Sequence, residues 1–292
     1  MSQKIFVISA DNLGLSRDQV DYPDLELLRF PVFVGDKEYR QDEVHNAKWL
    51  LQKYANEQVV AKSSTLVKQE MVDIVERVRS SYDMIVQVVM GSGMSSASFV
   101  VAENVRKMYE GIIPIVNVDS SQVINGVGNV LLGVIDLIKS NPNLSPEEIA
   151  QKSKDVVQNT FTYFIFPDLN YLYRGGRIGK AKSLVGTIMK IIPIIGMLGD
   201  NGEGVMVPVG KGRTFKQVNT QLVELIKAKM AEKSASTIKR MNLTHFGGND
   251  EAVAELKEMV GKLPCNDFII GTPNLVEAVY AGPGAYCLSM SL

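Results

Sequence analysis

Short apolar runs rich in β-branched residues alternate with amphipathic stretches in the first half of the chain, and this alternation limits its possible folds. Three runs have the length and composition of buried strands: 4–9, 84–90 and 112–118. Three helical patterns accompany them, at 47–55, 68–80 and 98–109. Strands separated by helices form a parallel sheet with crossover connections. The sequence therefore predicts an N-terminal α/β domain built on a parallel sheet.

A strong helix start divides this half from the next. Ser145 is placed to cap a helix, Pro146 suits its first turn, and Glu148 can complete a capping box. We expect this helix to end near Asn159 and a different arrangement of elements to follow. The sequence therefore predicts two domains, an N-terminal α/β domain and a C-terminal α/β domain, with residues 1–158 and 159–292.

The second half mixes strands and helices. Strands are expected at 162–166, 205–209, 237–244, 268–271 and 286–290. Helices are expected at 169–173, 215–232 and 250–263. The longest apolar segment, 185–198, is interrupted by Lys190 and Pro193. We expect it to form a buried helix that ends at the proline, followed by a strand.

Composition limits the classes of partner. A formal net charge of -1 on 292 residues gives no overall field to attract nucleic acid or an anionic membrane. Cys265 and Cys287 form no CxxC pattern, which disfavours a disulfide framework or a thiolate metal site and favours reduced thiols in the cytoplasm. No apolar run has the length of a signal peptide or a membrane span. We expect a cytoplasmic protein without metal, nucleic acid or stable membrane insertion, and take a monomer as the default.

Glycines and serines gather between a predicted strand and a predicted helix, in GSGMSS at 91–96. The first turn of a helix has unpaired N–H groups and the positive end of the helix dipole, so small residues there let an anion approach. Neither a Walker A loop nor a GxGxxG pattern is present, so a carboxylate or single phosphate fits better than a nucleotide. A serine at this place also simply caps a helix, and the residues alone leave both interpretations open. The same two interpretations apply to KSST at 62–65.

Two basic segments could contact phosphates or RNA, 174–182 and 211–214. No aromatic platform, RNP-type strand or zinc knuckle accompanies them, which favours a solvated surface or a partner contact. His45 and His245 are far apart in sequence and lack metal-ligand spacing. The sequence therefore gives little support to a metal site or to catalysis by histidine.

Six segments, taken together, resemble the DegV family. In chain order they are GSGMS (91–95), VDS (118–120), LNYLYRGGRI (169–178), IIPI (191–194), KGRT (211–214) and AGPGA (281–285). Their order and spacing fit essentially the whole chain. The LxYLxRGGRI element is the most specific of them, and the glycine-proline-glycine turn before a last strand comes next.

The resemblance implies two α/β domains with a lipid tunnel at their junction. One long-chain fatty acid would lie there with its tail buried and its carboxyl group near the junction. In bacteria such proteins are fatty-acid-binding subunits of a fatty acid kinase, whose separate ATP-binding subunit phosphorylates the bound carboxylate for phospholipid synthesis. The binding subunit has no cofactor and is not catalytic alone, which agrees with the missing Walker and Rossmann patterns.

The resemblance also implies site residues. The positions that fall on the carboxylate-binding motifs are Ser63, Ser64, Ser95, Ser96, Arg213 and Tyr280. Tyr280 stands where the family has histidine; its hydroxyl can donate to a carboxylate but cannot carry a positive charge near neutral pH. Ser96 replaces a glycine, and Thr65-Leu66 replaces a Gln-Pro pair. These departures indicate altered head-group recognition or an unusual ligand. For the tail, we expect a lining of Ile188, Met189, Ile192, Ile194 and Ile195.

A lipid site of this kind is physically consistent. A chain of about sixteen carbons gains many kcal/mol by burial, at roughly 0.8 kcal/mol per methylene before the costs of association. Hydroxyls, helix-terminal N–H groups and an arginine are the donors that a buried carboxylate needs. Two alternatives stay open: an enzyme acting on a small carboxylated or phosphorylated metabolite, and a basic surface that binds nucleic acid.

Overall fold

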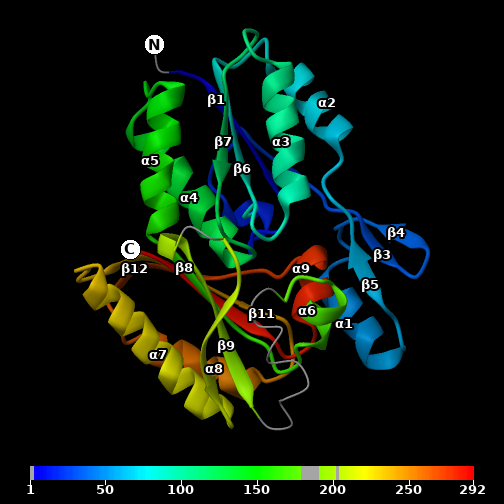
Figure 1. Cartoon of the computed structure of the whole chain (residues 1–292), viewed down its shortest axis with the longest axis vertical. Helices are drawn as coiled ribbons and strands as arrows, with labels where there is room; N and C mark the ends of the chain where they lie inside the picture. The colour runs from blue at the N-terminus through cyan, green and yellow to red at the C-terminus, as the bar shows by residue number, and fades with distance from the viewer. Residues whose placement is uncertain (1–2, 179–190, 202–203) are drawn as a thin grey trace.

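Two large β-sheets organise the fold (Figure 1). The computed structural model describes residues 3–178, 191–201 and 204–292. The first sheet has four parallel strands in the order β2-β1-β6-β7. These strands are β1 (Ile5–Ala10), β2 (Leu25–Leu28), β6 (Met84–Val89) and β7 (Ile115–Asp119). Three of them, β1, β6 and β7, are the strands that the sequence predicts in this half.

Helices cover both faces of the parallel sheet, with α2 and α3 on one face and α4 and α5 on the other (Figure 1). Their bounds are α2 (Lys68–Val78), α3 (Ser96–Met108), α4 (Asn125–Ser140) and α5 (Pro146–Gln158). Every residue of β1 and β6 is buried, as expected of strands covered on both faces. Alternate residues of β1 face opposite sides: Phe6 and Ile8 pack with α2 and α3, whereas Ile5 and Val7 pack with α4 and α5.

The capping box predicted at the start of α5 is present. Ser145 Oγ accepts a hydrogen bond from the Glu148 amide at 3.2 Å, and the Ser145 amide donates to Glu148 Oε2 at 2.8 Å. The helix ends at Gln158, and β8 begins at Thr160. The predicted end near Asn159 is therefore confirmed.

The second sheet has six strands of mixed direction, in the order β10-β9-β8-β13-β11-β12. They are β8 (Thr160–Ile165), β9 (Ile192–Leu198), β10 (Val207–Gly212), β11 (Ile238–His245), β12 (Cys265–Ile270) and β13 (Tyr286–Ser291). Among its neighbouring strand pairs, β11 and β12 are parallel and the other four pairs are antiparallel. Two helices cover one face, α7 (Phe215–Glu232) and α8 (Asp250–Val260) (Figure 1). The predicted α/β class, with a parallel N-terminal sheet and a second α/β sheet after it, is confirmed.

Strand β9 differs from the prediction at Pro193. The strand begins at Ile192, so the proline lies inside the strand and does not end a helix there. Pro193 pairs with Lys211 of β10, but the pairing of β9 with β8 stops at Ile194. The missing N–H therefore costs no ladder bond to β8. Of the helix expected from residue 185 to the proline, residues 185–190 lie outside the described residues, and Ile192 already belongs to the strand.

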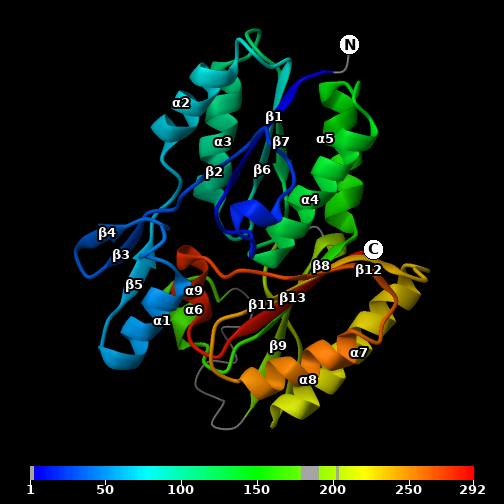
Figure 2. The ribbon, with the colours of Figure 1, turned by 180° about the vertical axis from the view of Figure 1, so that it is seen from behind.

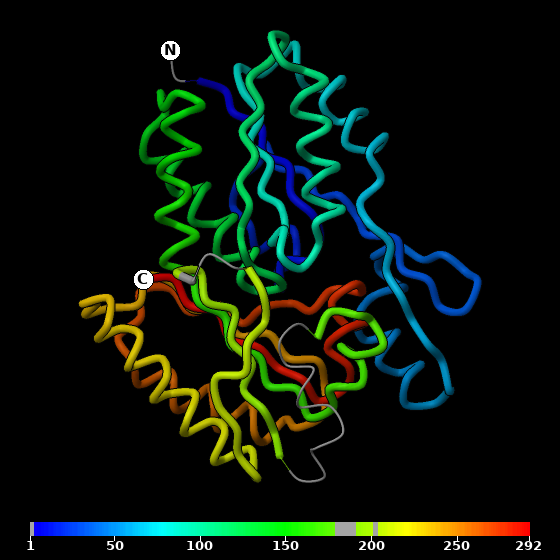
Figure 3. The backbone as a smooth tube through the Cα atoms, viewed as in Figure 1, coloured from blue at the N-terminus to red at the C-terminus, as the bar shows by residue number. Residues whose placement is uncertain are grey.

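A small antiparallel sheet, β4-β3-β5, leaves the N-terminal half and lies beside helices of the C-terminal half (Figure 2). Its strands and associated helix are β3 (Val32–Val34), β4 (Lys37–Tyr39), β5 (Ala61–Ser63) and α1 (Ala47–Asn56). The helices beside it are α6 (Asn170–Arg174) and α9 (Leu275–Ala281). The tube in Figure 3 follows this excursion from β2 and back into α2. The domain boundary near residue 158 stays a prediction. The small sheet and α1 come before this boundary in the sequence, but they lie beside helices that come after it.

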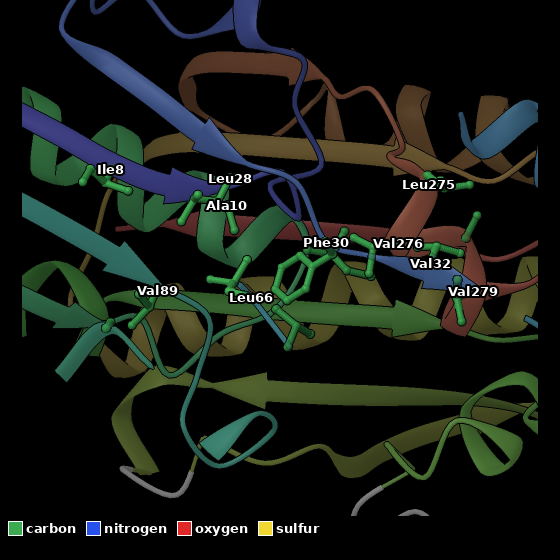
Figure 4. Packing of buried hydrophobic residues seen from close by; sticks show 14 of the residues in the cluster. Ile8, Ala10, Leu28, Phe30, Val32, Leu66, Val89, Leu275, Val276 and Val279 are labelled. Carbon is green, nitrogen blue, oxygen red and sulfur yellow. The ribbon is translucent and has the colours of Figure 1, made fainter. Parts of the chain in front are cut away.

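Buried apolar side chains join the three sheets in one cluster (Figure 4). Its labelled members come from β1, β2, β3, β6, α9 and adjoining loops: Ile8, Ala10, Leu28, Phe30, Val32, Leu66, Val89, Leu275, Val276 and Val279. The cluster also includes Phe164 and Ile195 of the six-stranded sheet. The three sheets therefore meet around a continuous apolar region.

Candidate functional site

A cavity opens within this apolar region. A water-sized sphere can occupy about 60 Å³ within it, and the empty space between its lining atoms, the opening to solvent included, is about 630 Å³. Its apolar lining is Phe30, Met90, Met94, Val123, Ile124, Phe166, Leu172, Met206, Val276 and Ala281. Its polar lining is Asn12, Ser63, Ser64, Ser95, Arg177, Glu277 and Tyr280. An apolar cavity with a few polar groups is the usual form of a small-molecule site.

Ser63 and Tyr280 meet at the cavity wall. Ser63 is the last residue of β5, Tyr280 lies on α9, and their hydroxyl oxygens are 2.6 Å apart. The contact joins positions 217 residues apart in sequence. Only one of the two hydroxyls can donate to the other, so the second O–H remains available as a donor. Two residues that the resemblance implies are thus brought together.

Ser95 lines the cavity at the start of α3. It occupies the N-cap position, but its side chain makes no capping hydrogen bond. Its hydroxyl instead donates to Ser98 Oγ at 3.0 Å, and Ser98 Oγ lies 3.2 Å from Thr65 Oγ1. Simple helix capping, the alternative left open by the sequence, therefore does not describe this serine. The Ser98–Thr65 contact links α3 to the segment that follows β5.

Arg177 lines the cavity, whereas the sequence favours a solvated surface or a partner contact for its basic segment. Its guanidinium carbon lies 5.5 Å from the centre of the Tyr280 ring, and its Nη1 donates to the Gly175 carbonyl at 2.8 Å. A side chain at Gly175 would overlap the Tyr280 ring, so glycine is needed for this packing. The sequence motif already contained this pair, because Gly175 and Arg177 both belong to the RGGRI element.

The other implied head-group residues lie in different places. Ser64 is exposed and lines the cavity, whereas Ser96 is exposed in the first turn of α3 and is not among the described lining residues. Arg213 is exposed just after β10, where its backbone amide donates to Gln217 Oε1 at 2.8 Å. Arg213 is not among the described residues that line the cavity.

The predicted tail residues divide between the two faces of β9. Ile195 is buried in the apolar cluster that surrounds the cavity. Ile194 points to the opposite face and packs with the α7 side, as does Ile192, because side chains alternate along a strand. Ile188 and Met189 lie outside the described residues.

Two buried polar side chains at the cavity were not among the predicted site residues. Glu277 is 2% exposed, and its two carboxyl oxygens accept from the Gly14 amide at 2.6 Å and the Asn274 amide at 2.8 Å. Burial raises the pKa of Glu277 to about 8, and burial likewise raises the pKa of the nearby Asp11 to about 7. Asn12 is 4% exposed, and neither of its amide atoms has a hydrogen-bond partner among the described residues.

Within residues 3–178, 191–201 and 204–292, no three histidine, cysteine, aspartate or glutamate side chains are grouped so as to hold a metal ion. Over the same ranges, no helix has the length and apolar character required to cross a bilayer.

Comparison with known proteins places the chain in a family. A family model described as "uncharacterised protein, DegV family" matches residues 4–291. The chain belongs to the DegV family. A DegV domain-containing protein of Clostridium acetobutylicum is 26% identical over 285 residues, which cover 97% of this chain and 96% of the relative. Protein DegV of Bacillus subtilis is 25% identical over 281 residues, or 96% of each chain.

Solved DegV structures share the fold. A fatty-acid-binding DegV family protein from Thermus thermophilus superposes with a TM-score of 0.87 at 21% identity, over 99% of this chain and all of its own. DegV of Bacillus subtilis, described as a fatty acid binding protein, superposes with a TM-score of 0.83 at 22% identity over the whole of both chains. At these identities the similarity establishes the fold, and the predicted DegV-like architecture is confirmed.

Proposed function

We propose that this DegV protein binds one long-chain fatty acid in the described cavity and presents its carboxylate to a separate kinase subunit. The observation that carries the proposal is the convergence of Ser63, Ser95, Tyr280 and Arg177 on a cavity whose other walls are mainly apolar. The fatty acids bound by the relatives from Thermus thermophilus and Bacillus subtilis support the same ligand class.

The polar wall has the chemistry that a carboxylate head requires. A carboxylate only accepts hydrogen bonds, and burial without donors costs several kcal/mol. The free O–H of the Ser63–Tyr280 pair can donate to it, and Arg177 supplies a positive charge beside the same ring. Ser95 stands at the N-terminus of α3, a helix of 13 residues, where the helix dipole also favours an anion.

The apolar wall suits the tail. Burial of about sixteen carbons contributes roughly 0.8 kcal/mol per methylene, so the tail supplies most of the gross binding energy before association costs. Met90, Met94 and Met206 line the cavity, and unbranched thioether side chains adapt to chains of different shape. The polar end then determines which end of the ligand stays near solvent.

The proposed partner is an ATP-binding kinase subunit in the cytoplasm. Ser64 and Arg177 are exposed as well as lining the cavity, so the head-group end is the part of the site that a second protein can reach. The sequence contains no phosphate-binding pattern of the Walker or Rossmann type, so ATP would come with the partner. The acyl phosphate formed there would serve phospholipid synthesis, and the chain alone would catalyse nothing.

Native mass spectrometry with lipid extraction tests the proposal. We expect one acyl chain per protein molecule, and affinity for the acid reduced about tenfold or more in Arg177→Ala, because a charge-assisted contact is lost. Arg213→Ala is the matched change at another exposed arginine. Because Arg213 is not among the described lining residues, we expect this variant to bind the acid normally and to be impaired only in acyl-phosphate formation with the partner.

Two results would contradict the proposal. The first is a purified protein that neither carries nor binds a long-chain acid. The second is turnover of a small carboxylated or phosphorylated metabolite without any partner, which would favour the enzyme alternative.

A further inference from the structure

The cavity has a second polar point, at Asn12. This residue follows β1 in the loop that carries Gly14, it is 4% exposed, and it lines the cavity. Its amide nitrogen and amide oxygen both lack a hydrogen-bond partner among the described residues. A buried amide is normally satisfied at both atoms, so an unpartnered one in a cavity wall indicates that a ligand group completes it.

This point and the Ser63–Tyr280 pair are held by different parts of the chain. Glu277 and Tyr280 lie three residues apart on α9, but their side chains are held by different parts of the chain. The Tyr280 hydroxyl is held by Ser63, whereas the Glu277 carboxyl is held by the Gly14 amide, two residues from Asn12. The cavity therefore carries one polar group beside the small sheet and another beside the loop after β1.

The group that would satisfy Asn12 must both donate and accept. The side-chain oxygen needs a donor and the side-chain nitrogen needs an acceptor, and a hydroxyl is the smallest group that supplies both. A carboxylate supplies acceptors only. Arg177 and the Ser63–Tyr280 pair, in contrast, supply the positive charge and the free O–H that suit a carboxylate.

We propose that Asn12 hydrogen-bonds a hydroxyl group on the acyl chain of the ligand, so that this protein selects hydroxylated long-chain acids. The inference rests on the proposed function and narrows its ligand class. It gives each polar point of the cavity one role: the carboxylate lies at Ser63, Tyr280 and Arg177, and the chain hydroxyl lies at Asn12.

Affinity measurements with a matched set of acids test this selection. The set holds chain length constant and includes the unsubstituted acid and isomers with one hydroxyl at successive positions. We expect one isomer to bind about tenfold more tightly than the unsubstituted acid, because only that hydroxyl reaches Asn12. Asn12→Leu keeps a similar volume without polar atoms, so it should lose the preference for that isomer over the unsubstituted acid.

Two variants control for effects on folding. Asn12→Ser retains a hydroxyl that can donate and accept, so it should keep part of the preference. Asn143→Leu makes the same chemical change at an exposed position away from the cavity and should leave the preference intact. Thermal unfolding of each variant shows whether it is folded under the binding conditions.

The possible failures are distinguishable. If long-chain acids bind but no hydroxylated isomer is preferred, a water molecule satisfies Asn12 and the inference is overturned while the proposed function stands. A preference that survives in Asn12→Leu overturns it as well, because the selecting group is then elsewhere. If no acid binds, both the proposed function and this inference fail.

Discussion

Replacement of Tyr280 by phenylalanine isolates the contribution of one hydroxyl to the site. The Tyr280 oxygen lies 2.6 Å from Ser63 Oγ, and its ring packs against Gly175 with the Arg177 guanidinium 5.5 Å from its centre. Tyr280→Phe keeps the ring and these ring contacts. Any change in the variant therefore reports on the hydroxyl alone.

The change should affect binding more than folding. A neutral hydrogen bond contributes about 0.5–1.5 kcal/mol to stability, and Ser63 is partly exposed and can turn to water, so we expect a loss near 0.5 kcal/mol. A hydrogen bond to a carboxylate is worth about 1.5–3 kcal/mol. At 1.4 kcal/mol per tenfold, this corresponds to a Kd for the fatty acid raised about 10- to 100-fold.

Calorimetric titration with a long-chain acid and urea unfolding measure the two effects on the same samples. Tyr173→Phe is the matched control, since Tyr173 is 48% exposed on α6 and does not line the cavity. Tyr280→His should recover much of the affinity, because imidazole also donates. An unchanged Kd in Tyr280→Phe, with the protein folded, would refute the assignment of this hydroxyl to the head group.

Two further perturbations test the packing and the charge of the site. Gly175→Ala places a methyl group against the Tyr280 ring, so we expect the ring to shift. Titration should then show the fatty acid bound at least about tenfold more weakly. Urea unfolding should show a loss of about 1–3 kcal/mol of stability. Asp11 and Glu277 have pKa values raised from 3.8 to about 7 and from 4.5 to about 8, so the folded state binds more protons than the unfolded state in this window. The contribution of these two groups to the free energy of unfolding should therefore be greatest below about pH 4 and should fall as the pH rises to about 8. Glu277→Gln should make the free energy of unfolding less dependent on pH in this window. An equally steep dependence in that variant would contradict the raised pKa of Glu277.

Three of the four strands of the parallel sheet, β1, β6 and β7, were predictable because they are short runs of mainly apolar, β-branched residues. Each of the six residues of β1 and of β6 is buried, so their runs need no tertiary information to be recognised. Helix α4 (Asn125–Ser140) was missed for the opposite reason: it is buried on nearly all sides and contains Gly126, Gly128 and Gly133, so it lacks the polar face that marks a helix in sequence. The three-residue strands of the small sheet are too short for a periodic signal.

The residues of the candidate site were predictable only where they belong to sequence motifs of the family. Ser63, Ser95 and Tyr280 came from the family resemblance and line one cavity. Arg177 belongs to the same resemblance, but a basic residue beside glycines was interpreted as surface. The buried position of Glu277 depends on a hydrogen bond to Gly14 across 263 positions, and no local pattern reports such a contact. Asn12 was missed for the same reason, because only the tertiary structure encloses it.

The central place of β13 has a consequence for how the protein is made. This strand is the last in sequence order, yet it joins β8 to β11 in the middle of the six-stranded sheet. A nascent chain therefore carries two incomplete half-sheets with open edges until β13 has been synthesised and can pair with both. Open edges can pair with strands of other chains, so the period before β13 pairs is when this fold is most exposed to aggregation and when a chaperone would protect it.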